Sequence, residues 1–233
     1  MTASIKCISS MATRLVLAEL SEAWRERSGC AVEIQSVGGV DAARRVQAGE
    51  AFDAVFLAAD AIDKLITSGH VLQGSRVDLF ESGVAVAVRV GEPWPDIGSE
   101  DALKRAVLSA SRVGYSTGPS GLALTKLFER WGIAAVVKDK IVQAPAGIPV
   151  GALLARGEIG LAFQQFSELM HLPGIEIVGP MPDAVRIDTT FSGGVCSGSL
   201  QPEAARQFLA QLASPETADA KRHHGMHPAR KAQ

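Results

Sequence analysis

Three short segments rich in serine, threonine and glycine lie where apolar strands should give way to helices. They are Cys7-Ile8-Ser9-Ser10, Ser36-Val37-Gly38-Gly39 and Ser116-Thr117-Gly118-Pro119-Ser120-Gly121. The N-terminus of a helix has unpaired backbone N–H groups and a partial positive charge, so each segment could hold an anion. Three such segments that face a common cleft would bind a small oxyanion or carboxylate with few charged side chains. Anion binding is therefore our working hypothesis.

The candidate ligand-binding residues offer neutral hydrogen-bond donors or let a ligand approach the backbone. From residue type and position they are Ser9, Ser10, Gly38, Gly39, Thr117, Ser120, Gly121, Gln164 and Gln165. Glycines allow close approach to backbone N–H groups, and serine, threonine and glutamine side chains can donate to the oxygens of an anion. Several neutral donors at separated positions favour a small di- or tricarboxylate as the ligand.

Structural explanations compete with binding at these positions. Ser9 and Ser10 could simply cap the first helix, and Gly118-Pro119-Ser120-Gly121 could be only a turn and an N-cap. One of Gln164 and Gln165 should point away from any ligand, because successive side chains of a strand face opposite sides. These alternatives remain open from the sequence.

Charged residues follow the second segment, on the helix expected from about residue 41 to residue 48. Asp41 is the one carboxylate directly beside the three segments, which makes it the candidate for a general base, although a helix N-cap is the favoured explanation. Arg44 or Arg45 could bind a carboxylate through two hydrogen bonds, but arginines on helices are more often solvated. The sequence identifies no further catalytic residue.

Short apolar runs alternate with amphipathic segments along the chain, a pattern typical of β/α units with a mainly parallel sheet. We predict an α/β protein made of two β/α lobes with a ligand cleft between them. The expected first lobe comprises residues 1–82 and 186–220, and the expected second lobe comprises residues 83–185.

Residues 221–233 are polar and basic, and we expect them to form a flexible tail. His223, His224 and His227 lie close together in this segment and could chelate a metal ion. A solvated tail is the favoured explanation, so the sequence predicts neither a metal site nor a cofactor.

Composition excludes several classes of protein. A formal net charge of −2 over 233 residues gives no electrostatic indication of nucleic-acid binding. Cys7, Cys30 and Cys196 are dispersed and include no C-x-x-C pair, which argues against a disulfide framework and a structural zinc site. No apolar run is long enough to span a membrane, and residues 1–20 lack a secretory signal. We expect a cytoplasmic location for this sequence, or a periplasmic one if the chain is a mature exported form or if the true start lies upstream.

The chain resembles the substrate-binding proteins of molybdate-type ABC transporters, which have the type II periplasmic-binding-protein fold. Ile8-Ser9-Ser10-Met11 is similar to the motif that ends the first strand in that family. Gly38-Gly39-Val40 and the following helix through Gly49 match the second loop, and Asp53-Ala54-Val55-Phe56-Leu57-Ala58-Ala59 looks like the next strand. In the second lobe, Gly157-Glu158-Ile159-Gly160-Leu161-Ala162-Phe163 looks like the segment that supplies a ligand-contacting tyrosine. The resemblance thereby adds Phe163 to the candidate ligand-binding residues.

Two differences from the family pattern bear on the ligand. Gly38 and Gly39 replace hydroxyl side chains of the second loop, and Phe163 lacks the hydroxyl of the family's tyrosine. Fewer hydroxyl donors and more room near the backbone favour a small carboxylate over molybdate.

The resemblance leaves two functions open. The first is a solute-binding protein that closes over a small anion and, if exported, delivers it to an ABC transporter permease. The second is an enzyme on the same fold: aconitate isomerase, which shifts a double bond within a tricarboxylate, is similar to this binding-protein family. Such an isomerase needs a base that removes a proton and donors that stabilise the resulting enolate-like charge. Binding is our main hypothesis from the sequence, and the isomerase is the alternative.

Overall fold

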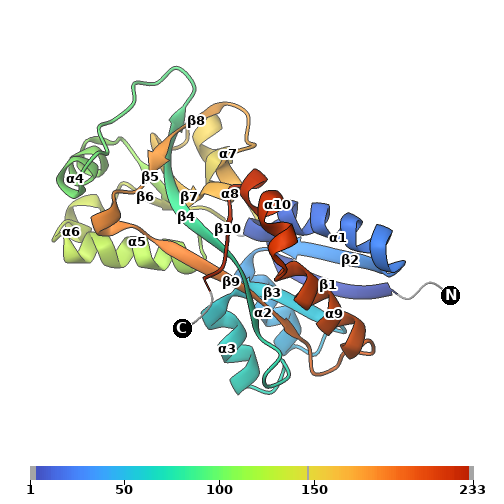
Figure 1. Ribbon diagram of the computed structural model, residues 1–233. Coiled ribbons are helices and arrows are strands. Elements are labelled where there is room, and N and C mark those ends of the chain that lie inside the picture. The colour runs from blue at the N-terminus through green and yellow to red at the C-terminus, as the bar shows by residue number, and fades with distance from the viewer. Residues whose placement is uncertain (1–3, 146, 231–233) are drawn as a thin grey trace. The chain divides into compact units, whose positions relative to one another are not determined.

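The computed structural model describes residues 4–145 and 147–230, with its helices and strands labelled in Figure 1. The chain forms two compact units, Met1–Ser82 with Thr190–Gln233 and Gly83–Thr189. Strands β4 (Val77–Arg89) and β9 (Asp188–Val195) carry the chain from one unit to the other. The second crossing therefore falls after residue 189, whereas the sequence predicted it after residue 185.

The sheet of the first unit has the strand order β2-β1-β3-β9. β1 (Ser4–Ser10), β2 (Ala31–Val37) and β3 (Ala54–Ala58) are parallel, and β9 runs antiparallel to β3. In the register of β1 and β2, Ser9 lies opposite Ser36. The predicted candidate serines thus stand at the carboxyl end of a central parallel strand.

Helices cover both faces of this sheet, because the apolar side chains of its central strands alternate between the two faces. Cys7 and Phe56 pack with α1 and α9, whereas Ile8 and Leu57 pack with α2 and α3. The covering helices are α1 (Arg14–Ser28), α2 (Gly39–Gln47), α3 (Ala59–Thr67) and α9 (Pro202–Leu212).

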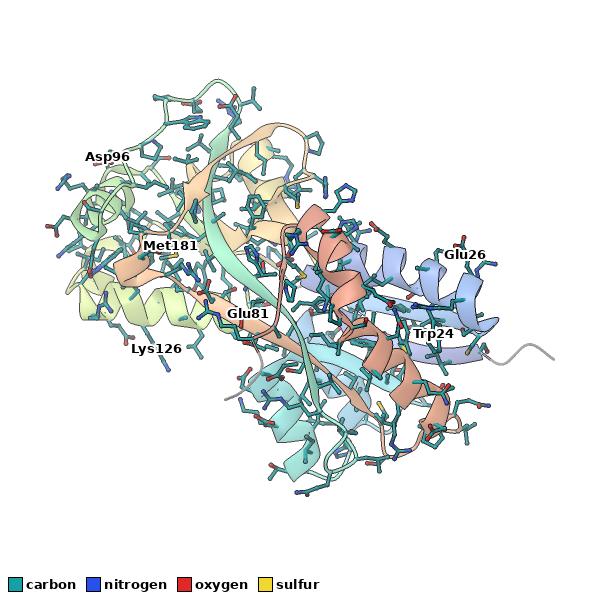
Figure 2. The ribbon with its side chains drawn as sticks, in the orientation of Figure 1. Trp24, Glu26, Glu81, Asp96, Lys126 and Met181 are labelled. Atoms are coloured by element: carbon teal, nitrogen blue, oxygen red, sulfur yellow. The ribbon has the colours of Figure 1, made fainter. Side chains whose placement is uncertain are left out.

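Aromatic contacts join α9 to the rest of the first core. The ring centroid of Phe208 on α9 lies 5.8 Å from that of Trp24 on α1 and 6.1 Å from that of Phe56 on β3. Figure 2 shows Trp24 directed from α1 toward the neighbouring C-terminal helices. The C-terminal part of the chain is therefore integral to the first unit.

The segment expected to be a flexible tail is folded over its described residues. It follows the 3-10 turn η3 (Pro215–Thr217) and contains the end of α10 (Ala218–His223) and β10 (His227–Pro228), which pairs with β4. Lys221 and Met226 are 2% and 0% exposed, so burial on both sides of the histidine pair holds this segment against the core. Residues 231–233 of the predicted tail lie outside the described residues.

The second unit has its own mixed sheet, in which β4 is followed in spatial order by β7, β5 and β6, and β8 also pairs with β4. β5 is parallel to β6 and β7, whereas β4 is antiparallel to β7 and β8. The strands are β5 (Val113–Tyr115), β6 (Ile141–Gln143), β7 (Leu161–Gln165) and β8 (Ile175–Pro180).

Two hydrophobic clusters cover the two faces of the second sheet. Leu161 and Phe163 of β7 pack with α4, α5 and α6, and Ala162 between them packs with α7 and α8. The helices are α4 (Glu100–Ser109), α5 (Pro119–Arg130), α6 (Ala134–Val137), α7 (Val150–Ala155) and α8 (Phe166–Leu169), with a 3-10 turn η2 (Asp183–Val185). None of the helices in the described parts of the chain is long and apolar enough to cross a membrane.

Candidate functional site

The end of β1 in the first unit carries two serines, Ser9 and Ser10, which differ in the hydrogen bonding of their hydroxyl groups. Ser9 Oγ lies 2.8 Å from Ser36 Oγ, so these two hydroxyls bond each other. Ser10 is 7% exposed, and its Oγ has no hydrogen-bond partner among the described residues. Ser10 stands at the N-cap of the 3-10 turn η1 (Met11–Thr13), but its side chain makes no capping hydrogen bond. Helix capping therefore does not account for either serine.

The start of α2 lies directly beside Ser10. Gly38 is the N-cap with φ −57°, which any residue can adopt, and a Cβ at this position would meet nothing within 4 Å. A Cβ at Gly39 would lie 3.7 Å from the Cβ of Ser10, an ordinary contact. Neither backbone strain nor packing requires these glycines, so they leave the first N–H groups of α2 uncovered by side chains of their own. An unpartnered hydroxyl and a helix N-terminus thus meet in the first unit.

The charged residues of α2 form ion pairs with nearby residues of the chain. Asp41 is the third residue of α2 rather than its N-cap, so the favoured sequence interpretation of this residue was wrong. It forms an ion pair with Arg44, and Arg45 pairs with Glu50. Asp41 remains an untested candidate for a base, and its carboxylate is already paired with the guanidinium group of Arg44.

The start of α5 in the second unit combines candidate donors with a packing constraint. Gly118 is the N-cap and supplies no side-chain hydrogen bond to the helix. Ser120 is buried, and its Oγ lies 3.3 Å from Ser116 Oγ. Thr117 is exposed. A Cβ at Gly121 would lie only 1.9 Å from the carbonyl oxygen of Ser116. Close packing therefore explains Gly121 without a ligand, whereas Thr117 and Ser120 keep their predicted role as candidates.

Strand β7 places Phe163, Gln164 and Gln165 on alternating faces, as the sequence predicted for the two glutamines. Phe163 is 2% exposed and belongs to the second hydrophobic core, so packing accounts for it without a ligand. Gln165 Nε2 donates to Thr189 Oγ1 at 2.7 Å, while Gln165 Oε1 is buried with no partner among the described residues. Gln164 faces the other way, toward α7 and α8.

Gln164 connects two short helices through both ends of its amide. Its Oε1 accepts a hydrogen bond from the backbone N–H of Gly151 at 3.2 Å, and its Nε2 donates to Glu168 Oε1 at 2.9 Å. This arrangement fixes the orientation of the Glu168 carboxyl group relative to the end of β7. The sequence analysis did not find this carboxyl group.

Glu168 in the second unit is a candidate general base or acid, because the pKa of its carboxyl group is raised. Burial raises its pKa from 4.5 to about 7, and the hydrogen bond from Gln164 opposes that rise. Glu168 keeps partial exposure to solvent. Ser167 Oγ next to it is buried and has no hydrogen-bond partner among the described residues. A carboxyl group with this pKa exists in both protonation states near neutral pH, which suits proton transfer.

Two α/β units joined by two crossing strands, each with a mixed sheet covered on both faces, define the architecture of type II periplasmic-binding proteins. The family model described as bacterial extracellular solute-binding protein matches residues 5–227, and the chain belongs to this family. The resemblance inferred from the sequence motifs is thereby confirmed.

Solved structures with low sequence identity share the fold. The periplasmic molybdate-binding protein of Azotobacter vinelandii is 18% identical with a TM-score of 0.81, over 97% of this chain and 100% of that one. The sulfate-binding protein SubI of Mycobacterium tuberculosis is 16% identical with a TM-score of 0.80, over 98% of this chain and 88% of that one. These similarities confirm the predicted fold class.

A curated relative is much more similar in sequence. An aconitate isomerase of Pseudomonas sp. is 40% identical over 231 residues, which cover 97% of this chain and 88% of the relative. Proteins similar to this chain therefore include a molybdate-binding protein and a sulfate-binding protein, which share its fold, and an aconitate isomerase.

Proposed function

We propose that this protein binds a small unsaturated polycarboxylate of the aconitate type and shifts a double bond within it. The observation that carries the proposal is the 40% identity to an aconitate isomerase over nearly the whole chain. The neutral donors of the candidate residues support a ligand with several carboxylates, and Glu168 supports a proton-transfer step. The alternative from the sequence thus becomes the main hypothesis.

Each unit by itself offers donors for a carboxylate group. In the first unit, the N-terminus of α2 and the Ser10 hydroxyl offer an uncovered set of donors. In the second unit, Thr117 and Ser120 lie at the start of α5, a helix of 12 residues. Helix N-termini stabilise negative charge without a formally charged side chain. Arg44 is already paired with Asp41, so backbone donors rather than this arginine would bind the carboxylate.

The chemical step is a proton transfer between two carbons of the substrate. In its carboxylate form, Glu168 removes a proton from the CH2 carbon that lies between a carboxylate and the double bond, and the C–H electron pair spreads over the allylic system and that carboxylate. The protonated Glu168 then returns a proton to the other end of the allylic system, so the double bond moves and no atom is gained or lost. Gln164 acts as a positioning residue, because it holds the Glu168 carboxyl group by a hydrogen bond.

The second candidate function is solute binding without turnover. Membership of a family of extracellular solute-binding proteins favours it, and so does the fold shared with molybdate- and sulfate-binding proteins. A protein of this kind would act outside the cytoplasm with an ABC transporter permease, whereas the isomerase would be consistent with a cytoplasmic location.

One titration series separates the two functions. Cis-aconitate, trans-aconitate, citrate and molybdate are added in turn to the purified protein, with heat release and the ultraviolet spectrum of each ligand followed in the same samples. The isomerase proposal predicts steady interconversion of the aconitate isomers. Saturable binding with unchanged ligand spectra would overturn it in favour of the binding protein, and binding of molybdate alone would overturn the carboxylate proposal as well.

A further inference from the structure

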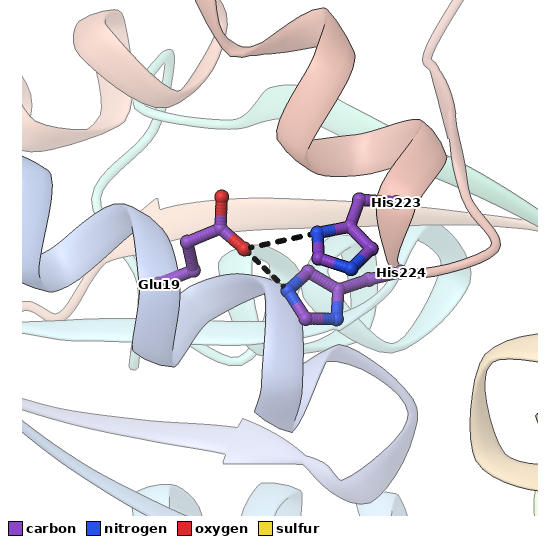
Figure 3. A group of neighbouring side chains, drawn as sticks. All are labelled: Glu19, His223 and His224. Atoms are coloured by element: carbon purple, nitrogen blue, oxygen red, sulfur yellow. Dashed lines mark hydrogen bonds and ion pairs between the residues drawn. The ribbon is translucent and has the colours of Figure 1, made fainter. Parts of the chain in front are cut away.

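The first unit contains a group of metal-ligating side chains that the proposed reaction does not use. Glu19 lies on α1, and His223 and His224 lie at the end of α10 (Figure 3). Glu19 Oε2 is 2.8 Å from His224 Nε2 and 3.7 Å from His223 Nδ1. One ligand atom from each residue lies within 4.8 Å of the others. The fold thus brings the carboxylate of Glu19 close to two adjacent imidazoles that lie about two hundred residues later in the sequence.

The backbone that carries the two histidines is held in place from both sides. Lys221 is buried, with its ammonium 5.2 Å from the ring centroid of Phe80, and Met226 is fully buried in the first core. The backbone N–H of His224 donates to the carbonyl of Ala220, which continues the helix through the pair. The histidines therefore stand on a packed helix end and not on the solvated tail that the sequence favoured.

We propose that Glu19, His223 and His224 form a surface site for a divalent transition-metal ion of the Zn²⁺ class. Two imidazoles and one carboxylate are a ligand set that Zn²⁺ takes in proteins, with the fourth position left to water. None of these three residues takes part in the proposed isomerase reaction. By joining α1 to α10, a bound ion would stabilise the C-terminal part of the first unit.

The geometry requires only side-chain adjustment. Tetrahedral ligands about 2.0–2.1 Å from a zinc ion are roughly 3.4 Å from one another. The Glu19–His224 pair would open from 2.8 Å, and the Glu19–His223 pair would close from 3.7 Å. The side chains of Glu19 and His223 are 45% and 71% exposed, so both can rotate, whereas His224 is 14% exposed and more firmly placed. The stacked imidazoles, with centroids 5.0 Å apart, would turn their ligand nitrogens toward a common point.

The test is calorimetric titration of Zn²⁺ into the protein at pH 7.5, after removal of any histidine tag. We expect one saturable site with a micromolar Kd, and at least a tenfold weaker Kd in Glu19→Gln and in His223→Ala. His227→Ala is the matched control: this histidine is exposed on β10 and outside the group, so the variant should bind as wild type does. Far-ultraviolet circular dichroism establishes that each variant is folded.

Titration with Co²⁺ gives an independent readout of the ligand set. Visible absorption bands typical of four-coordinate cobalt should appear with wild type and be lost in Glu19→Gln. Absence of saturable binding would overturn the proposal and leave Glu19 as an ordinary ion-pair partner of the histidines. Equal losses in His227→Ala and His223→Ala would also overturn it, because they would indicate nonspecific chelation by neighbouring histidines.

Discussion

Replacing Glu168 with glutamine removes a titratable group while keeping the shape of the side chain. The amide oxygen of the variant can still accept the hydrogen bond that Gln164 Nε2 donates at 2.9 Å. A change in stability should therefore report the charge of Glu168 rather than lost packing. The variant separates the electrostatic cost of this carboxylate from its structural role.

The magnitude follows from the raised pKa. A rise from 4.5 in water to about 7 in the folded protein corresponds to roughly 3 kcal/mol of folding free energy. The folded state binds the proton more tightly than the unfolded state, so the contribution of Glu168 is most favourable below pH 4.5. This favourable contribution to folding is lost as pH rises to about 7. Above that pH, Glu168 is charged in the folded state and lowers the free energy of unfolding by the full amount. Glu168→Gln should thus be close to wild type in stability at pH 4.5 and about 3 kcal/mol more stable at pH 8.

Urea denaturation of both proteins between pH 4.5 and 8 measures this difference. Glu129→Gln is the matched control, because Glu129 is an exposed carboxylate on α5 of the same unit. Its stability relative to wild type should not vary over this pH range. A difference between Glu168→Gln and wild type that is independent of pH would refute the assignment of a partly buried carboxylate whose charge destabilises the folded state.

The same variant tests the proposed catalytic role of Glu168. The carboxylate is the reactive form of the base, so kcat/KM for aconitate should rise with pH through about 7 in wild type. Glu168→Gln should lose at least about a hundredfold in kcat with little change in substrate affinity. Asp41→Asn should retain turnover, and the opposite outcome would transfer the role of the base to Asp41.

Further variants test the candidate binding residues and the packing of the second unit. Ser10→Ala should leave stability within about 0.5 kcal/mol, because its buried hydroxyl has no partner, but weaken carboxylate binding about tenfold in calorimetry. Ser9→Ala should cost about 1 kcal/mol in urea denaturation, because a bonded hydroxyl is lost. Gly39→Val should cover the first N–H groups of α2 and weaken binding at least about tenfold, and Gln47→Val on the same helix should not. Gly121→Ala should lower the free energy of unfolding by about 1–3 kcal/mol, because its Cβ would meet a carbonyl oxygen at 1.9 Å; unchanged stability would contradict that packing.

Much of the fold could be predicted from the sequence, because alternation of apolar and polar residues is a local property. The sequence predicted that strands end at Cys7-Ile8-Ser9-Ser10 and at Ser36-Val37-Gly38-Gly39, and β1 and β2 end at Ser10 and Val37. The prediction that Asp41 is the N-cap was wrong, because Gly38 is the N-cap of α2 and offers no side chain for a capping hydrogen bond. Sequence alone favours a polar cap and does not reveal a helix that starts at glycine.

Properties that depend on tertiary packing could not be predicted. Glu168 follows an apolar strand four residues after Gln164, a spacing that could have indicated their contact. Its raised pKa, however, comes from burial, which depends on how the folded chain packs around it. The grouping of Glu19 with His223 and His224 depends on the packing of α10 against α1. The composition of residues 221–233 instead suggested a solvated tail, because Lys221 is normally an exposed residue type.

The central claim is that the protein interconverts isomers of a small unsaturated tricarboxylate. Its most direct test is proton NMR of trans-aconitate incubated with the purified protein, alongside the same sample with Glu168→Gln. We predict steady appearance of cis-aconitate signals with wild type and almost none with the variant. Saturable binding of trans-aconitate with no change in its spectrum would contradict the isomerase and identify a solute-binding protein instead.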